Sequence, residues 1–251
     1  MKHLNTLLLS LTLLLSSLAQ GQLLRDHEVN ESTIKPWVAN DLKEYAGRYI
    51  FQPNDGNYLI VIIDDTNLVA QIQFPGHWTE GGNGLELGLA DSSEYKIHSE
   101  YVNLSSVKIS DGKFYSDEYK GEFISFDADK TYKGVKIYDS WSIWPGYTYE
   151  IGVKRKEKLE EFMFGDYKEA SISVLDSSEV SMLTKEEMQI MRNEIFARYH
   201  YKFKEGGKMA LYFSQKEWFT NSPARYKSVR HMLTWIELQN IELIKYYEEK
   251  K

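Results

Sequence analysis

The sequence predicts a protein of the segregated α+β class, in which an N-terminal antiparallel β-barrel or sandwich precedes a small C-terminal helical domain. About eight short runs rich in β-branched and aromatic residues lie between residues 41 and 155, and turn signals such as Asp111-Gly112 separate them. Beyond residue 167 the apolar residues recur instead at spacings of three and four, which is typical of amphipathic helices. The chain has 251 residues and 42% apolar content, enough for two hydrophobic cores.

Residues 1–21 carry the pattern of a cleaved signal peptide. An early cation, Lys2, precedes an apolar run over 7–15, and the small residues Ala19 and Gly21 follow. The run is too short to cross a bilayer, whose core requires ~20 apolar residues. The pattern predicts an exported protein, periplasmic or extracellular, without a transmembrane segment. Because the chain has no Cys, disulfides, thiolate metal sites and a lipid anchor on an N-terminal cysteine are also excluded.

Three segments follow the signal peptide before the helical part begins. Residues 22–40 are polar and contain Pro36, so they are expected to form a tether. The charge-dense residues 156–166 are expected to form a linker between the domains, as a short helix or an irregular segment. The β domain is expected over 41–155, with a barrel favoured over a sandwich. Within it Leu59-Ile60-Val61-Ile62-Ile63 is continuously apolar, which predicts burial on both faces or a place in an interface. The expected strands cover residues 45–51, 58–63, 68–74, 85–90, 101–109, 121–126, 134–138 and 147–153.

A short element occurs twice in the β domain. The pattern Glu-Tyr-x-Gly-x-aromatic begins at Glu44 and again at Glu118. A strand that opens on a glycine before alternating aromatic residues resembles the entry strand of small lipocalin-like barrels, where glycine permits close backbone packing at a bend. The resemblance implies a barrel.

Two helices in the C-terminal domain, expected over residues 167–251, begin with the same device. A threonine is followed three residues later by a glutamate, first at Thr184 and Glu187 and then at Thr234 and Glu237. In such a capping box the threonine hydroxyl accepts from the amide of the glutamate, whose carboxylate accepts from the amide of the threonine. The helices are therefore predicted to begin at these threonines and to pack through their apolar faces.

The stretch from Arg192 to Phe203, with Trp218-Phe219 and Leu233-Thr234 after it, resembles the YARHG domain, a family of bacterial exported proteins. The resemblance covers residues 167–247, about a third of the chain. It implies an envelope-associated setting outside the cytoplasm, often beside an unrelated partner domain, and it brings no defined biochemical activity. The family-motif positions are Arg192, Asn193, Glu194, Ile195, Phe196, Ala197, Arg198 and Trp218.

The chain departs from the naming motif of that family at three positions. Phe196 stands where the family has Tyr, Tyr199 where it has His, and His200 where it has Gly, while Ala197 and Arg198 match. Chemistry that used a hydroxyl at position 196 or an imidazole at position 199 could not proceed here in the same way. The resemblance implies that the family glycine ends a helix in the left-handed conformation, so His200 is expected to adopt it as well.

No motif in the sequence predicts a catalytic residue, a cofactor or a metal. No nucleophile lies in a recognisable context with a base, the histidines lack the spacing of metal ligands, and Gly81-Gly82-Asn83-Gly84 lacks the lysine of a phosphate-binding loop. That glycine run is interpreted as a hairpin turn. The pair Asp64-Asp65 is also interpreted as a turn, with a cation site as the alternative.

An aromatic group in the β region is the first candidate for ligand binding. Trp78, Trp141, Trp144 and Tyr147 could stack on sugar rings or line a pocket for an apolar ligand. The alternative is that these rings belong to the hydrophobic core.

The end of the first predicted helix is the second candidate, as an interaction site. Arg198, Tyr199, His200 and Tyr201 combine a cation, two phenols and an imidazole that could bind an acidic or glycan partner. In the structural alternative, Arg198 pairs with Glu194 four residues earlier and lies on an aromatic face.

The favoured hypothesis is an exported, non-enzymatic binding or interaction protein of the bacterial cell envelope, with an envelope glycan or protein as partner. One alternative is a hydrolase of envelope glycan or peptide that uses carboxylates such as Asp64, Asp65 or Asp139, and another is an inhibitor of a secreted enzyme. Nucleic acid is not an expected partner, because the net charge is −7. The charge is divided, since residues 22–181 carry 16 basic and 28 acidic side chains, whereas residues 182–251 carry 13 and 9. The basic half is therefore expected to face anionic envelope polymers or the acidic half.

Overall fold

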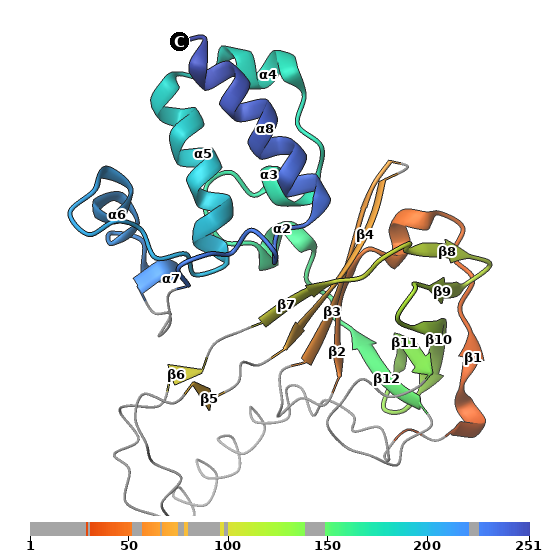
Figure 1. Ribbon diagram of the computed structural model, residues 1–251. Coiled ribbons are helices and arrows are strands. Elements are labelled where there is room, and N and C mark those ends of the chain that lie inside the picture. The colour runs from red at the N-terminus through yellow and green to blue at the C-terminus, as the bar shows by residue number, and fades with distance from the viewer. Residues whose placement is uncertain are drawn as a thin grey trace, which may run out of the picture.

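The structure is a computed structural model that describes residues 29, 31–51, 57–65, 67–74, 78–79, 96–97, 100–138, 149–220 and 226–251. It contains a curled antiparallel sheet with a group of helices packed against one side (Figure 1). The predicted signal peptide and the strand expected over 85–90 lie outside the described residues. The strands are β1 (Lys35–Pro36), β2 (Gly47–Phe51), β3 (Asn57–Asp64), β4 (Asn67–Phe74), β5 (Trp78–Thr79), β6 (Lys96–Ile97), β7 (Glu100–Asn103), β8 (Lys108–Ser110), β9 (Lys113–Tyr115), β10 (Lys120–Asp127), β11 (Thr131–Tyr138) and β12 (Tyr149–Lys154).

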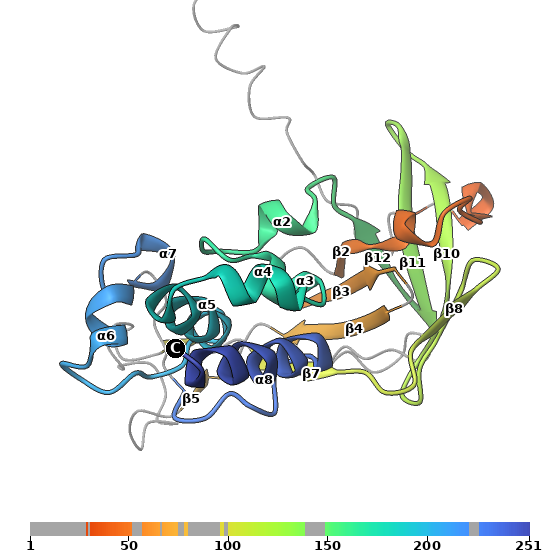
Figure 2. The same ribbon diagram turned by 90° about the horizontal axis from the view of Figure 1, so that it is seen from above.

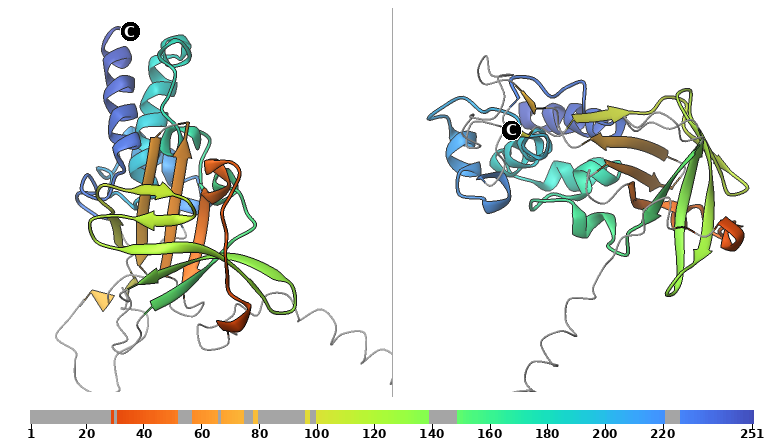
Figure 3. Two further views of the ribbon diagram at one scale, coloured as in Figure 1. Left: turned by 90° about the vertical axis from the view of Figure 1, so that its right-hand side faces the viewer. Right: turned by 90° about the horizontal axis from the view of Figure 1, so that it is seen from below.

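One antiparallel sheet holds ten of these described strands. Its path runs β7-β4-β3-β2-β12-β11-β10-β9-β8, while β1 pairs with β10 and the strands β5 and β6 form a separate pair. The strands at the two ends of the path, β7 and β8, follow each other in the chain, so the sheet bends strongly between them (Figure 3). The result is a half barrel, which confirms the predicted antiparallel β domain.

The concave side of the half barrel holds a core of aromatic and aliphatic side chains. Tyr49, Phe51, Phe114 and Phe123 are fully buried there, and the ring of Tyr45 stacks on that of Phe123 with centroids 4.1 Å apart. The apolar surface that these rings remove from water stabilises the curl of the sheet. The other buried members are Trp37, Leu59, Val61, Ile63, Ala70, Ile72, Leu104, Val135 and Ile137.

The repeated Glu-Tyr-x-Gly element makes similar contacts at both of its positions. The carboxylate of Glu44 accepts from two backbone amides three and four residues earlier, at 3.4 and 3.1 Å, and that of Glu118 accepts from the amide of Ser105 at 3.0 and 3.1 Å. Both glycines are required: Gly47 has a φ of +143°, and a Cβ on Gly121 would lie 2.4 Å from a backbone oxygen of β11. The sequence echo therefore reflects two strand entries at which a glutamate accepts from backbone amides, locally at Glu44 and from a residue 13 positions earlier at Glu118.

Residues 31–40, which belong to the expected tether, pack against the β domain. After the short 3-10 helix η2 (Glu31–Thr33), β1 pairs with the half of β10 that β9 leaves free. The amide of Trp37 donates to the carbonyl oxygen of Phe123 at 2.9 Å, and the Trp37 side chain is 8% exposed. A two-residue strand that contains a proline has no periodicity, so the sequence pattern could not predict this contact.

The helical part consists of several short helices around two long ones, α5 and α8, which lie side by side (Figures 1 and 2). Apolar faces of these two helices meet in a second core that includes Met188, Ile195, Ile241 and Ile244. The helices are α2 (Leu159–Phe162), α3 (Glu169–Ile172), α4 (Ser177–Met182), α5 (Lys185–Arg198), α6 (Lys208–Phe213), α7 (Glu217–Thr220) and α8 (Trp235–Glu249).

Both predicted capping boxes are present and set the starts of the long helices. The hydroxyl of Thr184 accepts from the amide of Glu187 at 3.2 Å, and that of Thr234 accepts from the amide of Glu237 at 3.2 Å. At the other end of α5, His200 has a φ of +59°, which confirms the expected left-handed conformation just beyond the helix.

The helical domain packs on the outer face of β3 and β4 (Figure 2). Alternate residues of β3 explain its continuous apolar run, because Leu59, Val61 and Ile63 face the inner core while Ile60 and Ile62 contact the helices. Ile236, in the first turn of α8, is fully buried in this contact. The prediction that this run lies in an interface is confirmed. The other residues in the contact are Val69, Leu159, Phe162 and Ile172.

Candidate functional site

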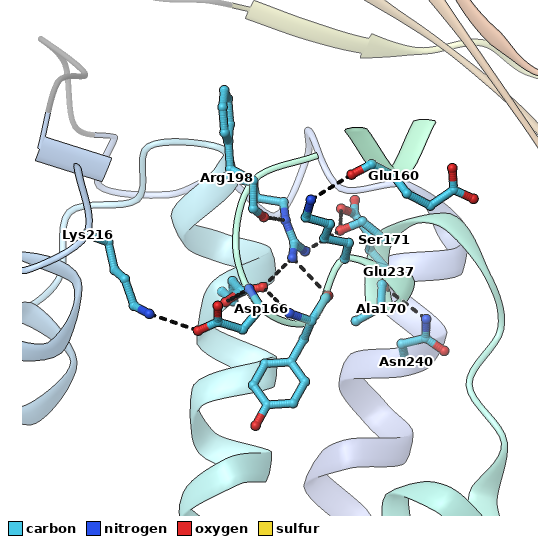
Figure 4. A network of polar contacts seen from close by, with 12 residues as sticks. Glu160, Asp166, Ala170, Ser171, Arg198, Lys216, Glu237 and Asn240 are labelled. Atoms are coloured by element: carbon cyan, nitrogen blue, oxygen red, sulfur yellow. Dashed lines mark hydrogen bonds and ion pairs between the residues drawn. The ribbon is translucent and has the colours of Figure 1, made fainter. Parts of the chain in front are cut away.

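A buried charge pair lies at the centre of the family motif (Figure 4). The carboxylate of Glu194 is fully buried and accepts from the amides of Asp166 (2.9 Å) and Tyr167 (2.7 Å), and from the guanidinium of Arg198. Arg198 also donates to the carbonyl oxygens of Phe164 (2.7 Å) and Tyr167 (2.8 Å). These two side chains therefore anchor the segment before α3 to the end of α5.

The same polar network continues to the sheet. The Ser171 hydroxyl accepts from Arg198 at 2.8 Å and donates to Glu237 at 2.6 Å (Figure 4). The other oxygen of the Glu237 carboxylate accepts from the Tyr199 hydroxyl at 2.7 Å, and Tyr199 in turn accepts from Gln71 of β4 at 3.3 Å. Hydrogen bonds thus link the family motif, through α3 and α8, to the β domain.

Two amides on the outer face of the sheet hold the segment that leads into α8. Gln71 and Asn103 are opposite each other on β4 and β7 and are joined by a hydrogen bond of 2.9 Å. Gln71 donates to the carbonyl oxygen of Met232 at 2.8 Å, and Asn103 donates to that of Leu233 at 2.9 Å. The domain interface is therefore apolar at its centre and hydrogen-bonded at its edge.

Three of the four residues predicted to form an interaction site divide between the interior and the surface, while the fourth, His200, lies just beyond the end of α5. Arg198 and Tyr199 make the internal contacts described above. The pairing of Arg198 with Glu194 is the contact expected if Arg198 has a structural role instead of binding a partner. The replacement of the family histidine by Tyr199 supplies the hydroxyl that reaches both Glu237 and the sheet. Tyr201 is half-buried and, unlike Arg198 and Tyr199, lines a hollow on the surface of the domain.

This hollow, of about 360 Å³, lies between α5 and the segment that leads into α6. Two family-motif residues, Arg192 and Asn193, contribute to it from the outer side of α5. Its lining combines aromatic rings, amides and cations, and no acidic residue belongs to it. The lining residues are Gln189, Arg192, Asn193, Tyr201, Phe203, Lys204, Gly207, Lys208, Met209 and Ala210. We refer to it as the α5 hollow.

The walls of the α5 hollow are held by contacts behind them. The Glu248 carboxylate binds the guanidinium of Arg192 at 3.0 and 3.2 Å, and the Asn193 amide donates to a backbone oxygen one turn earlier at 2.7 Å. The ring of Phe203 stacks on that of Phe213, with centroids 5.0 Å apart and 12° between the planes. The site is therefore largely pre-formed, which lowers the entropy cost of binding.

A second hollow, of about 490 Å³, lies between residues 174–177 and α8. Its buried amide, Asn240, accepts from the amide of Leu175 at 2.9 Å and donates to two carbonyl oxygens, of Ala170 and Ser173, at 2.9 and 2.7 Å. Because these contacts occupy the amide, this hollow offers fewer polar groups to a ligand than the α5 hollow does.

Several other residues that the sequence offered as site candidates have structural roles or lie outside the residues that the structure describes. Asp64 accepts from the amide of Val174 at 2.8 Å, and Asp65 pairs with Lys43 at 3.0 Å in a turn where its φ is +50°. The side chain of Trp218 stacks on Phe164 with centroids 6.0 Å apart. Trp141, Trp144, Tyr147 and Asp139 lie outside the described residues, and β5 is described for Trp78 only as backbone.

Sequence patterns did not point to several residues of the network and the hollow. Ser171 meets Glu237 only when α3 packs on α8, and Gln71 meets Tyr199 only when the helical domain docks on the sheet. Single polar residues of this kind carry no spacing signal. For Gln189 a signal existed, because it lies three and four residues before Arg192 and Asn193 on one face of the helix. Within the described ranges, no three His, Asp or Glu side chains gather as a metal site.

The pKa values of the two capping-box glutamates are shifted in opposite directions. Burial is the largest cause at Glu237, and hydrogen bonds are the largest cause at Glu187. Burial raises the pKa of Glu237 above its ordinary value of 4.5, against the effect of hydrogen bonds from Ser171, Thr234 and Tyr199. Glu187, which is only partly buried, has its pKa lowered by its hydrogen bonds to Thr184. Burial also raises the pKa of Glu194, although Arg198 and two backbone amides oppose the shift.

These pKa shifts predict that the stability changes in two matched variants depend on pH in opposite ways. A raised pKa means that the folded state binds the proton more tightly, so the stability that Glu237 contributes is fully present below pH 4.5 and is lost as the pH rises through its folded pKa. The difference in free energy of unfolding between the wild type and Glu237→Gln should therefore fall as the pH rises from 4. For Glu187→Gln the difference should instead be present above pH 4.5 and vanish as the pH falls. Urea unfolding from pH 3.5 to 8 tests both, and equal slopes would contradict the assignment.

The fold and the sites define a two-domain α+β protein, in which a β half barrel carries a docked helical domain. Residues 166–249 match the family model of the YARHG domain, so the C-terminal third is a YARHG domain, as its motif residues predicted. The N-terminal part matches no family model. No curated protein and no solved structure matches the chain, so the likeness to lipocalin-like barrels stays a prediction.

The YARHG domain occurs in exported bacterial proteins, which is consistent with export of this chain. Among the described helices, none has both the length and the apolar character that crossing a membrane requires.

Proposed function

We propose that this chain is an exported, non-enzymatic binding protein of the bacterial cell envelope, periplasmic or extracellular, and that it binds through the α5 hollow. One observation carries the proposal: the family motif divides between two faces of α5. Glu194, Ile195 and Arg198 are used inside the domain, whereas Arg192 and Asn193 line an open concavity. The inward residues have a role in the folded domain. Arg192 and Asn193 instead contribute to a surface with polar and aromatic groups, as a binding site requires.

Four described carboxylates favour binding over hydrolysis. Glu194 and Glu237 each accept several hydrogen bonds from within the protein, and Asp64 and Asp65 are bound to an amide and a lysine. General acid–base chemistry needs a carboxyl group that can reach a substrate. The lining of the α5 hollow contains no such group. The half barrel then acts as the scaffold that holds the helical domain.

A comparison of two filled hollows tests this function. Gln189 on α5 and Gln239 on α8 line the first and second hollow respectively, so Gln189→Trp and Gln239→Trp make the same change at two sites. The mature chain, residues 22–251, is immobilised and exposed to envelope fractions, and the retained material is identified. We expect Gln189→Trp to abolish retention of a component that the wild type and Gln239→Trp both hold. Equal retention by all three proteins, or loss with Gln239→Trp alone, would contradict the assignment.

A further inference from the structure

We infer that the ligand of the α5 hollow is an acidic saccharide, whose anionic group is a carboxylate or a phosphate. This inference rests on the proposed function and names its ligand class. Three features of the lining carry it: the sign of the charge, the availability of the cations, and the combination of rings with amides.

The charged residues in the hollow are all basic. Arg192, Lys204 and Lys208 line it, and no Asp or Glu does. Lys208 pairs with Glu186 at 3.0 Å, but both side chains are more than half exposed, and such surface pairs are worth only ~0–1 kcal/mol. No described acidic side chain pairs with Lys204. An anionic group can therefore bind these two lysines without breaking a strong contact.

Arg192 is a fixed cation in the lining of the hollow. Glu248 binds its Nε and Nη2 at 3.0 and 3.2 Å, and both side chains are mostly buried. No described residue bonds to Nη1 of this guanidinium. A guanidinium that one carboxylate orients can present its remaining N–H groups to a carboxylate or phosphate in a defined direction.

The other lining groups distinguish a sugar from an acidic peptide. The rings of Tyr201 and Phe203 are half-buried and meet nearly at right angles, 5.1 Å apart, so they provide apolar surface against which the C–H face of a sugar can pack. Gln189 and Asn193 supply amide groups, which can donate to and accept from hydroxyls. A poly-acidic peptide could pair with the cations, but it has neither the C–H face to pack on the rings nor the hydroxyls to bind the amides.

The charge of the segment that contains the α5 hollow acts in the same direction. Residues 182–251 carry 13 basic and 9 acidic side chains, whereas residues 22–181 carry 16 and 28. A polyanion is therefore attracted to residues 182–251, which include the whole lining of the α5 hollow, and repelled by residues 22–181, and this long-range attraction weakens with salt.

Calorimetric titration of the mature chain with defined hexamers tests the ligand class. The probes are hexagalacturonate, a phosphorylated oligomannoside, neutral maltohexaose and hexaglutamate, each at 20 and 500 mM salt. We expect at least one acidic saccharide to bind about tenfold or more tightly than maltohexaose and hexaglutamate at low salt, with the margin reduced at high salt. The two acidic sugars distinguish carboxylate from phosphate.

A matched pair of double variants locates the interaction. Lys204→Glu with Lys208→Glu reverses two cations of the hollow, and Lys108→Glu with Lys113→Glu makes the same charge change on exposed residues of the half barrel. The first pair should weaken binding of the acidic sugar at least about tenfold, and the second should leave it unchanged. Equal affinity for acidic and neutral sugars, equal affinity for hexaglutamate, or no saccharide binding would overturn the inference. If Gln189→Trp still abolished retention of an envelope component in that case, the proposed function would stand and only the ligand class would fail.

Discussion

Replacement of Arg198 by Met should lower the free energy of unfolding by about 3–5 kcal/mol, as is typical when one partner of a buried ion pair is removed. The Arg198 side chain is 6% exposed and its partner Glu194 is fully buried. Without the guanidinium, the Glu194 carboxylate keeps only two backbone amides, and the carbonyl oxygens of Phe164 and Tyr167 each lose a donor. Urea unfolding followed by far-UV circular dichroism measures the change.

Arg230→Met serves as the control, because the Arg230 side chain is 64% exposed and its contact with Glu242 is 4.0 Å long. The control should change stability by no more than about 0.5 kcal/mol. The double variant Glu194→Met with Arg198→Met should be less destabilised than the sum of the single variants, because it leaves no unpaired charge. A loss below about 1 kcal/mol for Arg198→Met would show that the network does not anchor the domain.

The fold was largely predictable because its strongest signals are local. The capping boxes at Thr184 and Thr234 place two helix starts by hydrogen bonds within four residues, and both are present. The apolar run 59–63 predicted an interface because a strand exposes alternate residues to opposite faces. By contrast, β1 and the contact of Trp37 with β10 depend on pairing across some 90 residues, and no local pattern encodes such a partner.

The candidate site was predictable only in part, for a related reason. The motif residues Arg192 to Arg198 were recognised together, but the sequence does not separate those that face inward from those that face outward. Helical spacing alone pairs Arg198 with Glu194, as observed. The α5 hollow additionally needs Phe203 and Lys208, whose positions depend on how the segment before α6 folds back. Tertiary packing therefore decides which motif residues are available to a ligand.

The interface between the domains determines whether the YARHG domain moves independently. Interfaces within a chain allow relative motion by default, unless they are large and apolar. Here Ile236 is fully buried against Ile60, Ile62 and Val69, and Gln71 and Asn103 bind the segment before α8. These contacts predict that the wild-type domains unfold together in one transition.

Ile236→Asp should uncouple the two domains, lowering the stability of the docked state by at least about 3 kcal/mol, because it places an unpaired carboxylate in the apolar centre of the interface. Position 236 is the second residue of α8, where a negative charge favours the helix itself, so the helix should persist while docking is lost. Thermal unfolding should then show two transitions, and hydrogen exchange should increase in β3 and β4.

Ile236→Val keeps the interface apolar and should cost only about 0.5–1.5 kcal/mol, with one transition retained. A single, unshifted transition in Ile236→Asp would instead mean that the hydrogen bonds of Gln71, Asn103 and Tyr199 suffice to hold the domains together. If the domains separate as expected, the α5 hollow should survive, because all of its lining belongs to the helical domain. Binding that persisted in Ile236→Asp would then assign recognition to that domain and rigid presentation to the half barrel.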